Sequence, residues 1–94
     1  IHEFSNENAP FVLFPNPGTE NFMISIELNK PSQLNFSIVT SSGKKVFSSK
    51  NKIYPVGPHQ IKLLENNQSL SEGIYFITLD LNGSRFAKKL VVIK

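Results

Sequence analysis

The sequence predicts an all-β fold, an antiparallel β-sandwich of about seven short strands, from three observations. Apolar residues recur at every second position, which is the spacing of one face of a strand. β-Branched and aromatic residues dominate these segments, and Pro and Gly separate them at intervals of about 8–12 residues. No apolar stripe with the spacing of a helix is long enough to form one.

The chain has 94 residues, which suits a single domain. Leu, Ile, Val and Phe make up about a third of it, so a small core is expected. Because cysteine is absent, packing rather than disulfides must stabilise the fold, and a Cys-based zinc site is excluded. The apolar runs are too short to span a membrane. Residues 1–9 are polar and aperiodic and predict a linker, whereas residues 10–94 predict the folded domain.

The first half of the chain predicts four strands. A first strand must stop at Pro15, because proline donates no ladder hydrogen bond. Alternating apolar residues predict strands over residues 22–28 and 34–38. Residues 41–44 form the next turn, with Gly43 at a positive φ, and Val46 and Phe47 begin the return strand. Asn16 is expected to hydrogen-bond its neighbouring backbone within a rigid corner.

The second half begins less regularly. Residues 54–58, with two prolines and a glycine, predict a rigid and irregular connection. Ile61 and Leu63 predict another short strand, and residues 66–72 predict a polar loop around Leu70.

The last 22 residues predict a β-hairpin around Asn82-Gly83, the strongest short hairpin signal. The face of the strand before the turn is apolar and comprises Tyr75, Ile77, Leu79 and Leu81. Residues 85–94 form the return strand. About seven strands of this kind describe an Ig-like sandwich.

This turn also predicts the register of the hairpin. The predicted cross-strand pairs are Leu79 with Phe86, Tyr75 with Leu90, and Ile77 with Lys88. The first two pairs are favourable, but a lysine opposite an isoleucine is a conflict. Either Lys88 reaches solvent along a sheet edge, or a β-bulge interrupts the register, and the sequence leaves both open.

The net charge of +3 is unevenly distributed. The last ten residues contain Arg85, Lys88, Lys89 and Lys94 and no acidic residue. Such a basic end suits an anionic lipid, a nucleic acid or an acidic partner. Lysines that protect a strand edge are the simpler explanation, which charge alone favours.

Catalytic patterns are weak. A Ser-His-Asp site would need Asp80, the only Asp, together with His59 and one of the serines, but no strained nucleophile turn is present. The glycines are too far apart for a phosphate loop, and a calcium loop starting at Asp80 would place Val91 where an acid is needed. We therefore expect no enzyme activity, no cofactor, no metal and no small-molecule substrate.

Binding patterns are also sparse. Carbohydrate modules use exposed Trp or Tyr, but this chain has no Trp and two Tyr, of which Tyr75 alternates with core residues. Phe86 is the only aromatic residue among the C-terminal basic residues, so nucleic acid binding is not expected. A carbohydrate- or protein-binding β-sandwich appended to a secreted enzyme remains the alternative function.

Five segments together resemble one family, the type A C-terminal sorting domain of the type IX (Por) secretion system. They are Phe11–Pro17 with the opening P-N-P, Ile38–Val46 with the G-K turn, Gly57–Leu63 with G-x-x-x-I-x-L, Leu70–Ile77 with L-x-x-G-I-Y-F-I, and Lys88–Lys94 with the basic-apolar ending. The resemblance covers residues 11–94 in the family's order. Two positions depart from its pattern: Thr40 replaces a common Asp, and Ser71-Glu72 replaces a frequent Pro-Ala.

The resemblance implies a folded, non-catalytic address label on an exported cargo of Bacteroidetes-type bacteria. Residues 1–9 would link it to that cargo. Expected partners are the type IX translocon, outer-membrane shuttle proteins and a sortase-like surface peptidase that removes the domain. The cargo would cross the periplasm and then reside at the cell surface or outside the cell. We expect a monomer, although the exposed edges are compatible with a strand-exchanged dimer.

Two groups of residues carry the expected function. The candidates for translocon recognition are Lys88, Lys89, Leu90, Val91, Val92, Ile93 and Lys94, by charge or by strand addition at the edge of the last hairpin. The family-motif residues with a structural or recognition role are Pro15, Asn16, Pro17, Gly43, Gly73 and Tyr75. Gly73 is expected to act as a backbone hinge and Tyr75 as a core anchor.

Overall fold

A computed structural model describes residues 10–64 and 69–93 of the chain. The described residues form eight strands, which confirms the predicted all-β fold. The strands are β1 (Phe11–Phe14), β2 (Met23–Leu28), β3 (Ser32–Thr40), β4 (Lys45–Ser48), β5 (Lys52–Tyr54), β6 (Gly57–Lys62), β7 (Gly73–Leu81) and β8 (Ser84–Val92). The predicted linker over residues 1–9 lies outside the described residues.

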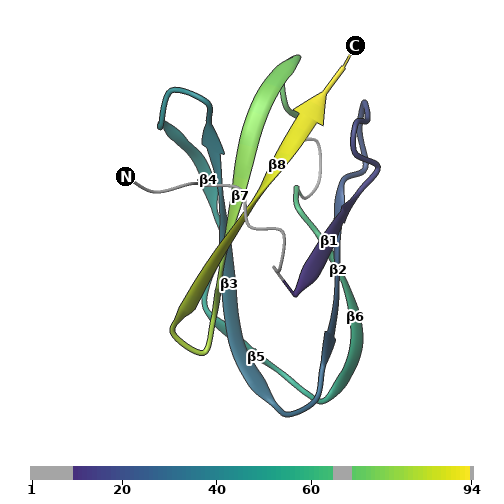
Figure 1. Ribbon diagram of the computed structural model, residues 1–94, viewed down its shortest axis with the longest axis vertical. Helices are drawn as coiled ribbons and strands as arrows, with labels where there is room; N and C mark the ends of the chain where they lie inside the picture. The colour runs from purple at the N-terminus through teal and green to yellow at the C-terminus, as the bar shows by residue number, and fades with distance from the viewer. Residues whose placement is uncertain (1–9, 65–68, 94) are drawn as a thin grey trace.

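Two antiparallel sheets pack as a sandwich (Figure 1). One sheet has the order β1-β2-β6. The other has the order β4-β3-β7-β8, and β5 also pairs with β3. Strands β4 and β5 occupy successive parts of the same edge of β3, with Phe47 opposite Ile38 and Lys52 opposite Leu34. The sandwich therefore has two long sides: β1 and β8 are the edge strands on one side, and β6 faces the β4–β5 edge on the other.

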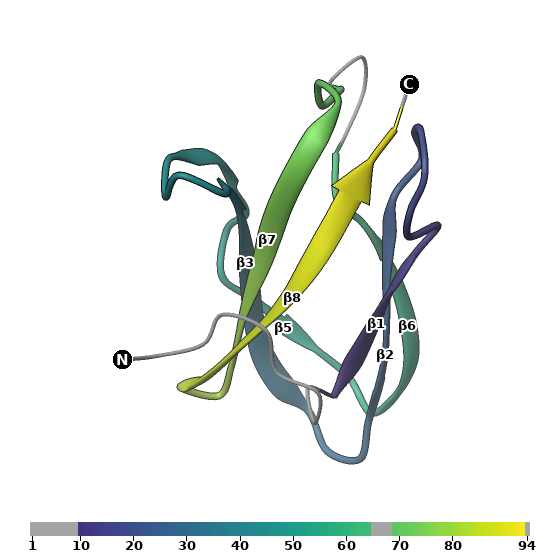
Figure 2. The same ribbon diagram turned by 45° about the horizontal axis from the view of Figure 1, so that its top comes forward.

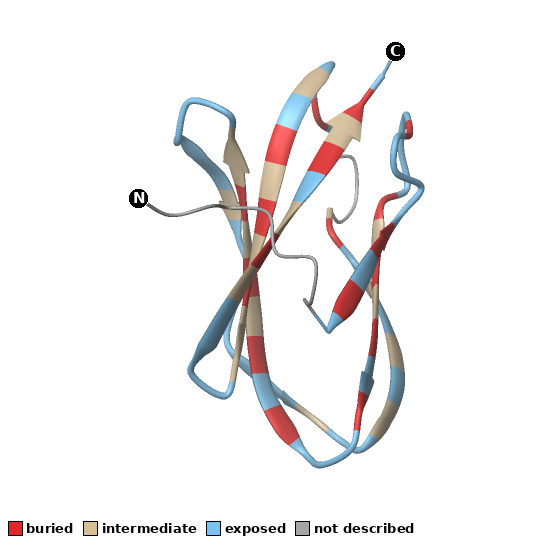
Figure 3. Ribbon diagram, in the orientation of Figure 1, coloured by how far each residue is buried: buried red, intermediate tan, exposed pale blue. Residues whose placement is uncertain are grey.

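The core follows the period-two pattern of the sequence. Buried residues alternate mostly with half-buried ones along the central strands (Figure 3). Their fully or nearly fully buried side chains are Ile24, Ile26, Leu28, Leu34, Phe36, Ile38, Tyr75, Ile77 and Leu79. Each fully buried side chain of this size contributes about 1.5–3 kcal/mol of hydrophobic stabilisation. These residues hold the two sheets together without a disulfide.

The predicted β7–β8 hairpin is confirmed. Asn82 and Gly83 both have positive φ angles, 51° and 89°, as a two-residue type I′ turn requires. The register pairs Leu79 with Phe86 and Tyr75 with Leu90. The turn is also tied to β3, because Gln33 N donates to Asn82 Oδ1 at 2.9 Å and Asn82 N donates to Gln33 O at 2.9 Å.

The prediction for residues 54–58 is wrong. Tyr54 ends β5, and Gly57 and Pro58 already belong to β6, so that only Pro55 and Val56 connect the two strands. A proline is tolerated in β6 because it lies at a sheet edge, where its missing N–H is not needed. Strand β5 has three residues, and its central Ile53 is 69% exposed, so it lacks the buried alternation that identifies the longer strands.

Candidate functional site

The loop between β1 and β2 touches the last strand. Figures 1 and 2 both place the C-terminal end of β8 beside this connection. The Asn16 side chain uses both ends of its amide there: Nδ2 donates to Lys89 O at 2.9 Å, and Oδ1 accepts from Val91 N at 3.0 Å. The partners are 73 and 75 residues away in the chain, so the expectation that Asn16 bonds its neighbouring backbone is wrong.

The backbone of Gly18 continues this contact. Gly18 N donates to Val91 O at 3.1 Å, Ile93 N donates to Gly18 O at 2.8 Å, and Gly18 forms an isolated parallel bridge with Val92. A Cβ at residue 18 would lie 2.5 Å from Pro15 Cγ, so a side chain does not fit. We call residues 15–18 the PNP corner. It binds the edge of β8 through four hydrogen bonds, two from a side chain and two from the backbone.

The PNP corner divides the edge of β8 into two halves. Its hydrogen bonds engage Lys89, Val91 and Ile93, which direct their backbone groups away from β7. Because this direction alternates along a strand, Arg85 and Ala87 also direct theirs outward. Among the described residues, β8 has no strand partner on that side. With respect to the described residues, the edge is therefore closed from Lys89 to Ile93 and open from Ser84 to Lys88.

The seven candidate recognition residues have different environments. Leu90 and Val92 are core residues with exposed fractions of 0% and 1%. Val91 is half-buried, whereas Ile93 is 46% exposed. Lys94 lies outside the described residues. Leu90 and Val92 are therefore inaccessible to a partner in the folded domain.

The two lysines of the candidate set lie on opposite faces of β8. Lys88 pairs with the buried Ile77 in an uninterrupted register, so the alternative of a β-bulge is wrong. Its side chain is half-buried on the inner face at the sheet edge, while Lys89 is exposed on the outer face. The two charges therefore flank the edge of β8 from both sides.

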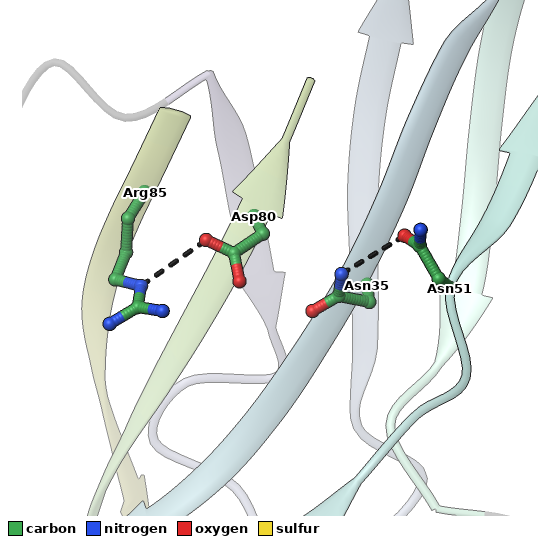
Figure 4. Close-up of polar contacts among 4 residues, drawn as sticks. All are labelled: Asn35, Asn51, Asp80 and Arg85. Carbon is green, nitrogen blue, oxygen red and sulfur yellow. Dashed lines mark hydrogen bonds and ion pairs between the residues drawn. The ribbon is translucent and has the colours of Figure 1, made fainter. Parts of the chain in front are cut away.

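The basic character of the last segment is smaller than the sequence indicates. Arg85 Nε lies 3.2 Å from Asp80 Oδ1 on the neighbouring strand (Figure 4). This exposed ion pair offsets the charge of Arg85. Lys88 and Lys89 make no ion pair with the described residues, so they carry the positive charge of β8.

The other motif residues occupy defined positions in the fold. Tyr75 is 8% exposed and donates from its hydroxyl to Ser71 O at 2.8 Å, as a core anchor does. Gly73 starts β7, and Gly43 has the predicted positive φ, 99°. Thr40, which departs from the usual Asp, accepts a hydrogen bond from Lys44 N through Oγ1 at 3.0 Å. The hydroxyl thus supplies the acceptor that a carboxylate would provide.

The polar cluster beside the hairpin contains Asp80 but not His59. Asn35 Nδ2 donates to Asn51 Oδ1 at 3.0 Å, near the Asp80–Arg85 pair (Figure 4). Asp80 belongs to β7, whereas His59 lies on β6 in the other sheet and donates from Nε2 to Pro55 O at 2.7 Å. The structure therefore does not bring Asp80 and His59 together.

Several other kinds of site are absent from the part of the chain that the structure describes. Within residues 10–64 and 69–93, no group of three His, Asp or Glu side chains could hold a metal ion. Phe14 is the only exposed aromatic side chain of the described residues, so they present no row of rings for a carbohydrate. The same residues contain no helix of the length and apolar character needed to cross a membrane.

Comparison with known families gives one result. A family model described as the secretion system C-terminal sorting domain matches residues 12–94. The match includes the PNP corner and all of β8. Comparisons with curated proteins and with solved structures found no match.

Proposed function

Because the chain belongs to the family of secretion system C-terminal sorting domains, we propose that the type IX translocon recognises it at the edge of β8. The family marks a C-terminal type IX sorting signal and is non-catalytic in general. Such a domain interacts with the secretion machinery and belongs to a protein exported to the cell surface or the extracellular space. The observation that carries the proposal is the arrangement of Lys88 and Lys89 on the two faces of one strand edge.

The lysines favour contact at the edge over contact on a sheet face. A partner on the outer face would meet Lys89 alone, and a partner on the inner face is excluded by the core. A partner at the edge lies near both ammonium groups. Acidic side chains on such a partner would be attracted to both lysines, which favours encounter and orientation.

Strand addition is restricted to the open half of the edge. The PNP corner already binds four outward-directed backbone groups of β8 and the residue after it: Lys89 O, Val91 N, Val91 O and Ile93 N. Within residues 10–64 and 69–93, no backbone hydrogen bond engages the outward groups of Arg85 and Ala87, which can pair with an extended segment of a receptor. We therefore place the receptor strand along Ser84–Lys88, with the corner holding the rest of β8 in place.

Point substitutions test this better than a deletion. Removal of residues 90–94 would also remove the core residues Leu90 and Val92, so lost export would reflect unfolding. The variant K88Q/K89Q instead removes two charges from the edge. The matched control K44Q/K45Q removes two adjacent charges from the β3–β4 turn and the start of β4.

The expected result is selective. In a bacterium with type IX secretion, a signal-peptide reporter fused to the chain should appear outside the cell at least about tenfold less for K88Q/K89Q, and at the parent level for K44Q/K45Q. Circular dichroism melting of both purified variants checks that they fold. Equal export by the two folded variants would reject the edge of β8 as the recognised surface.

The later fate of the domain is part of the same proposal. We include in it passage across the periplasm, contact with outer-membrane shuttle proteins and removal by a sortase-like peptidase. Residues 1–9 would provide the peptidase with an accessible linker. The cargo would then be attached to the cell surface or released.

A further inference from the structure

The side of the sandwich away from the PNP corner contains a groove. It lies between β6 and the β4–β5 edge and has a volume of about 450 Å³. Its apolar lining consists of Phe36, Phe47, Tyr54 and Ile61. Phe36 and Phe47 pack together with ring centroids 5.8 Å apart. The groove therefore leads from the surface to the edge of the core.

The charges around the groove have one sign. Lys50, Lys52 and Lys62 line it and are exposed, and none of its described lining residues is acidic. Lys50 lies between β4 and β5, Lys52 on β5 and Lys62 on β6, so lysines stand on both sides of the groove. Such a site attracts a ligand that combines carboxylates with apolar side chains.

Strand β6 adds a hydrogen-bonding edge. Leu63 N, just after β6, donates to Phe22 O at 3.0 Å. Because the direction of backbone groups alternates, Gln60 and Lys62 direct their N–H and C=O groups away from β2. Pro58 has no N–H to offer. The part of this edge at Gln60 and Lys62 can thus pair with a short extended peptide.

We propose that this groove binds an extended acidic peptide segment that pairs with β6 at Gln60 and Lys62. Its apolar side chains cover Phe47 and Tyr54, and its carboxylates approach the three lysines. A sugar ring is disfavoured because the Tyr54 ring already contacts Lys52 Nζ, 5.5 Å from its centroid, and His59, with ring centroids 5.2 Å apart. This site is independent of the edge of β8 and of the proposed export function.

Fluorescence anisotropy with the 94-residue chain tests the proposal. The probe is a labelled heptapeptide of alternating Phe and Glu, and its control carries Lys in place of Glu. We expect the acidic probe to bind, more weakly at higher salt, and the basic control not to bind. No binding of the acidic probe at low salt, or equal binding of both probes, would overturn the proposal.

Variants locate the binding. K50Q/K52Q/K62Q should weaken binding of the acidic probe by at least about tenfold, because the modest contributions of three exposed ion pairs add up. Q60P, which removes one outward-directed N–H, should also weaken binding of the acidic probe. The matched control K30Q/K44Q/K45Q should leave that binding unchanged. Melting curves confirm folding, and if Q60P does not fold, the two lysine triples decide. Binding of polygalacturonate but not of the peptide would show a glycan groove and overturn the peptide assignment.

Discussion

The two long sides of the sandwich differ in how far they are closed. On one side, the PNP corner joins the β1–β2 connection to β8 through Asn16 and Gly18. On the other, β6 and the β4–β5 edge leave a groove lined by lysines. The PNP corner thus blocks part of the β8 edge with fixed hydrogen bonds. The rest of β8 and the edge of β6 have no such cover among the described residues and carry lysines or a proline instead. Recognition by a partner is expected at the unprotected edges.

The largest loss of stability should come from a substitution in the core next to the PNP corner. Leu90 on β8 is fully buried, so L90A removes apolar contacts and leaves a cavity. We expect a loss of about 2–5 kcal/mol in the free energy of unfolding, measured by urea denaturation. V46A, at a 43% exposed position on β4, serves as the control and should change stability by less than about 0.5 kcal/mol. Similar losses in both variants would contradict the assignment of Leu90 to the core.

A smaller loss of stability should distinguish the hydrogen bonds of the PNP corner from those near the β4–β5 edge. N16A removes both amide contacts with β8, and we expect a loss of about 1–2 kcal/mol. N51A removes one exposed contact with Asn35 near the β4–β5 edge and should cost less than about 0.5 kcal/mol. Hydrogen exchange of the Val91 amide should become faster in N16A but not in N51A. An unchanged Val91 rate in N16A would show that the corner does not close the edge.

The elements predicted correctly from the sequence are those fixed by local patterns. Alternation over residues 22–28 and 34–38 identified β2 and β3, because each strand buries one face. Asn82-Gly83 fixed the register of the last hairpin, because few residue pairs adopt two positive φ angles. Strand β5 was not predicted, since its three residues have no buried face pattern.

The candidate site depended more on tertiary structure. The predicted pairing of Tyr75 with Leu90 already placed Leu90 on the core face, so its burial followed from the register. The contact of Asn16 with Lys89 and Val91 did not, because no local pattern identifies partners more than 70 residues away. The lysine groove was not predicted either, since Lys50, Lys52 and Lys62 meet only when β6 faces β5.

Proline substitutions on the two sides of the sandwich test most directly whether the open half of β8 is the recognised edge. Proline is introduced at an outward-directed position on each side of the sandwich: A87P on β8 and Q60P on β6. Export of the reporter fusion is then measured for both variants, after melting curves show that they fold. We expect A87P to reduce export strongly and Q60P to leave it at the parent level. Parent-level export by folded A87P, or loss of export by Q60P alone, would contradict this expectation.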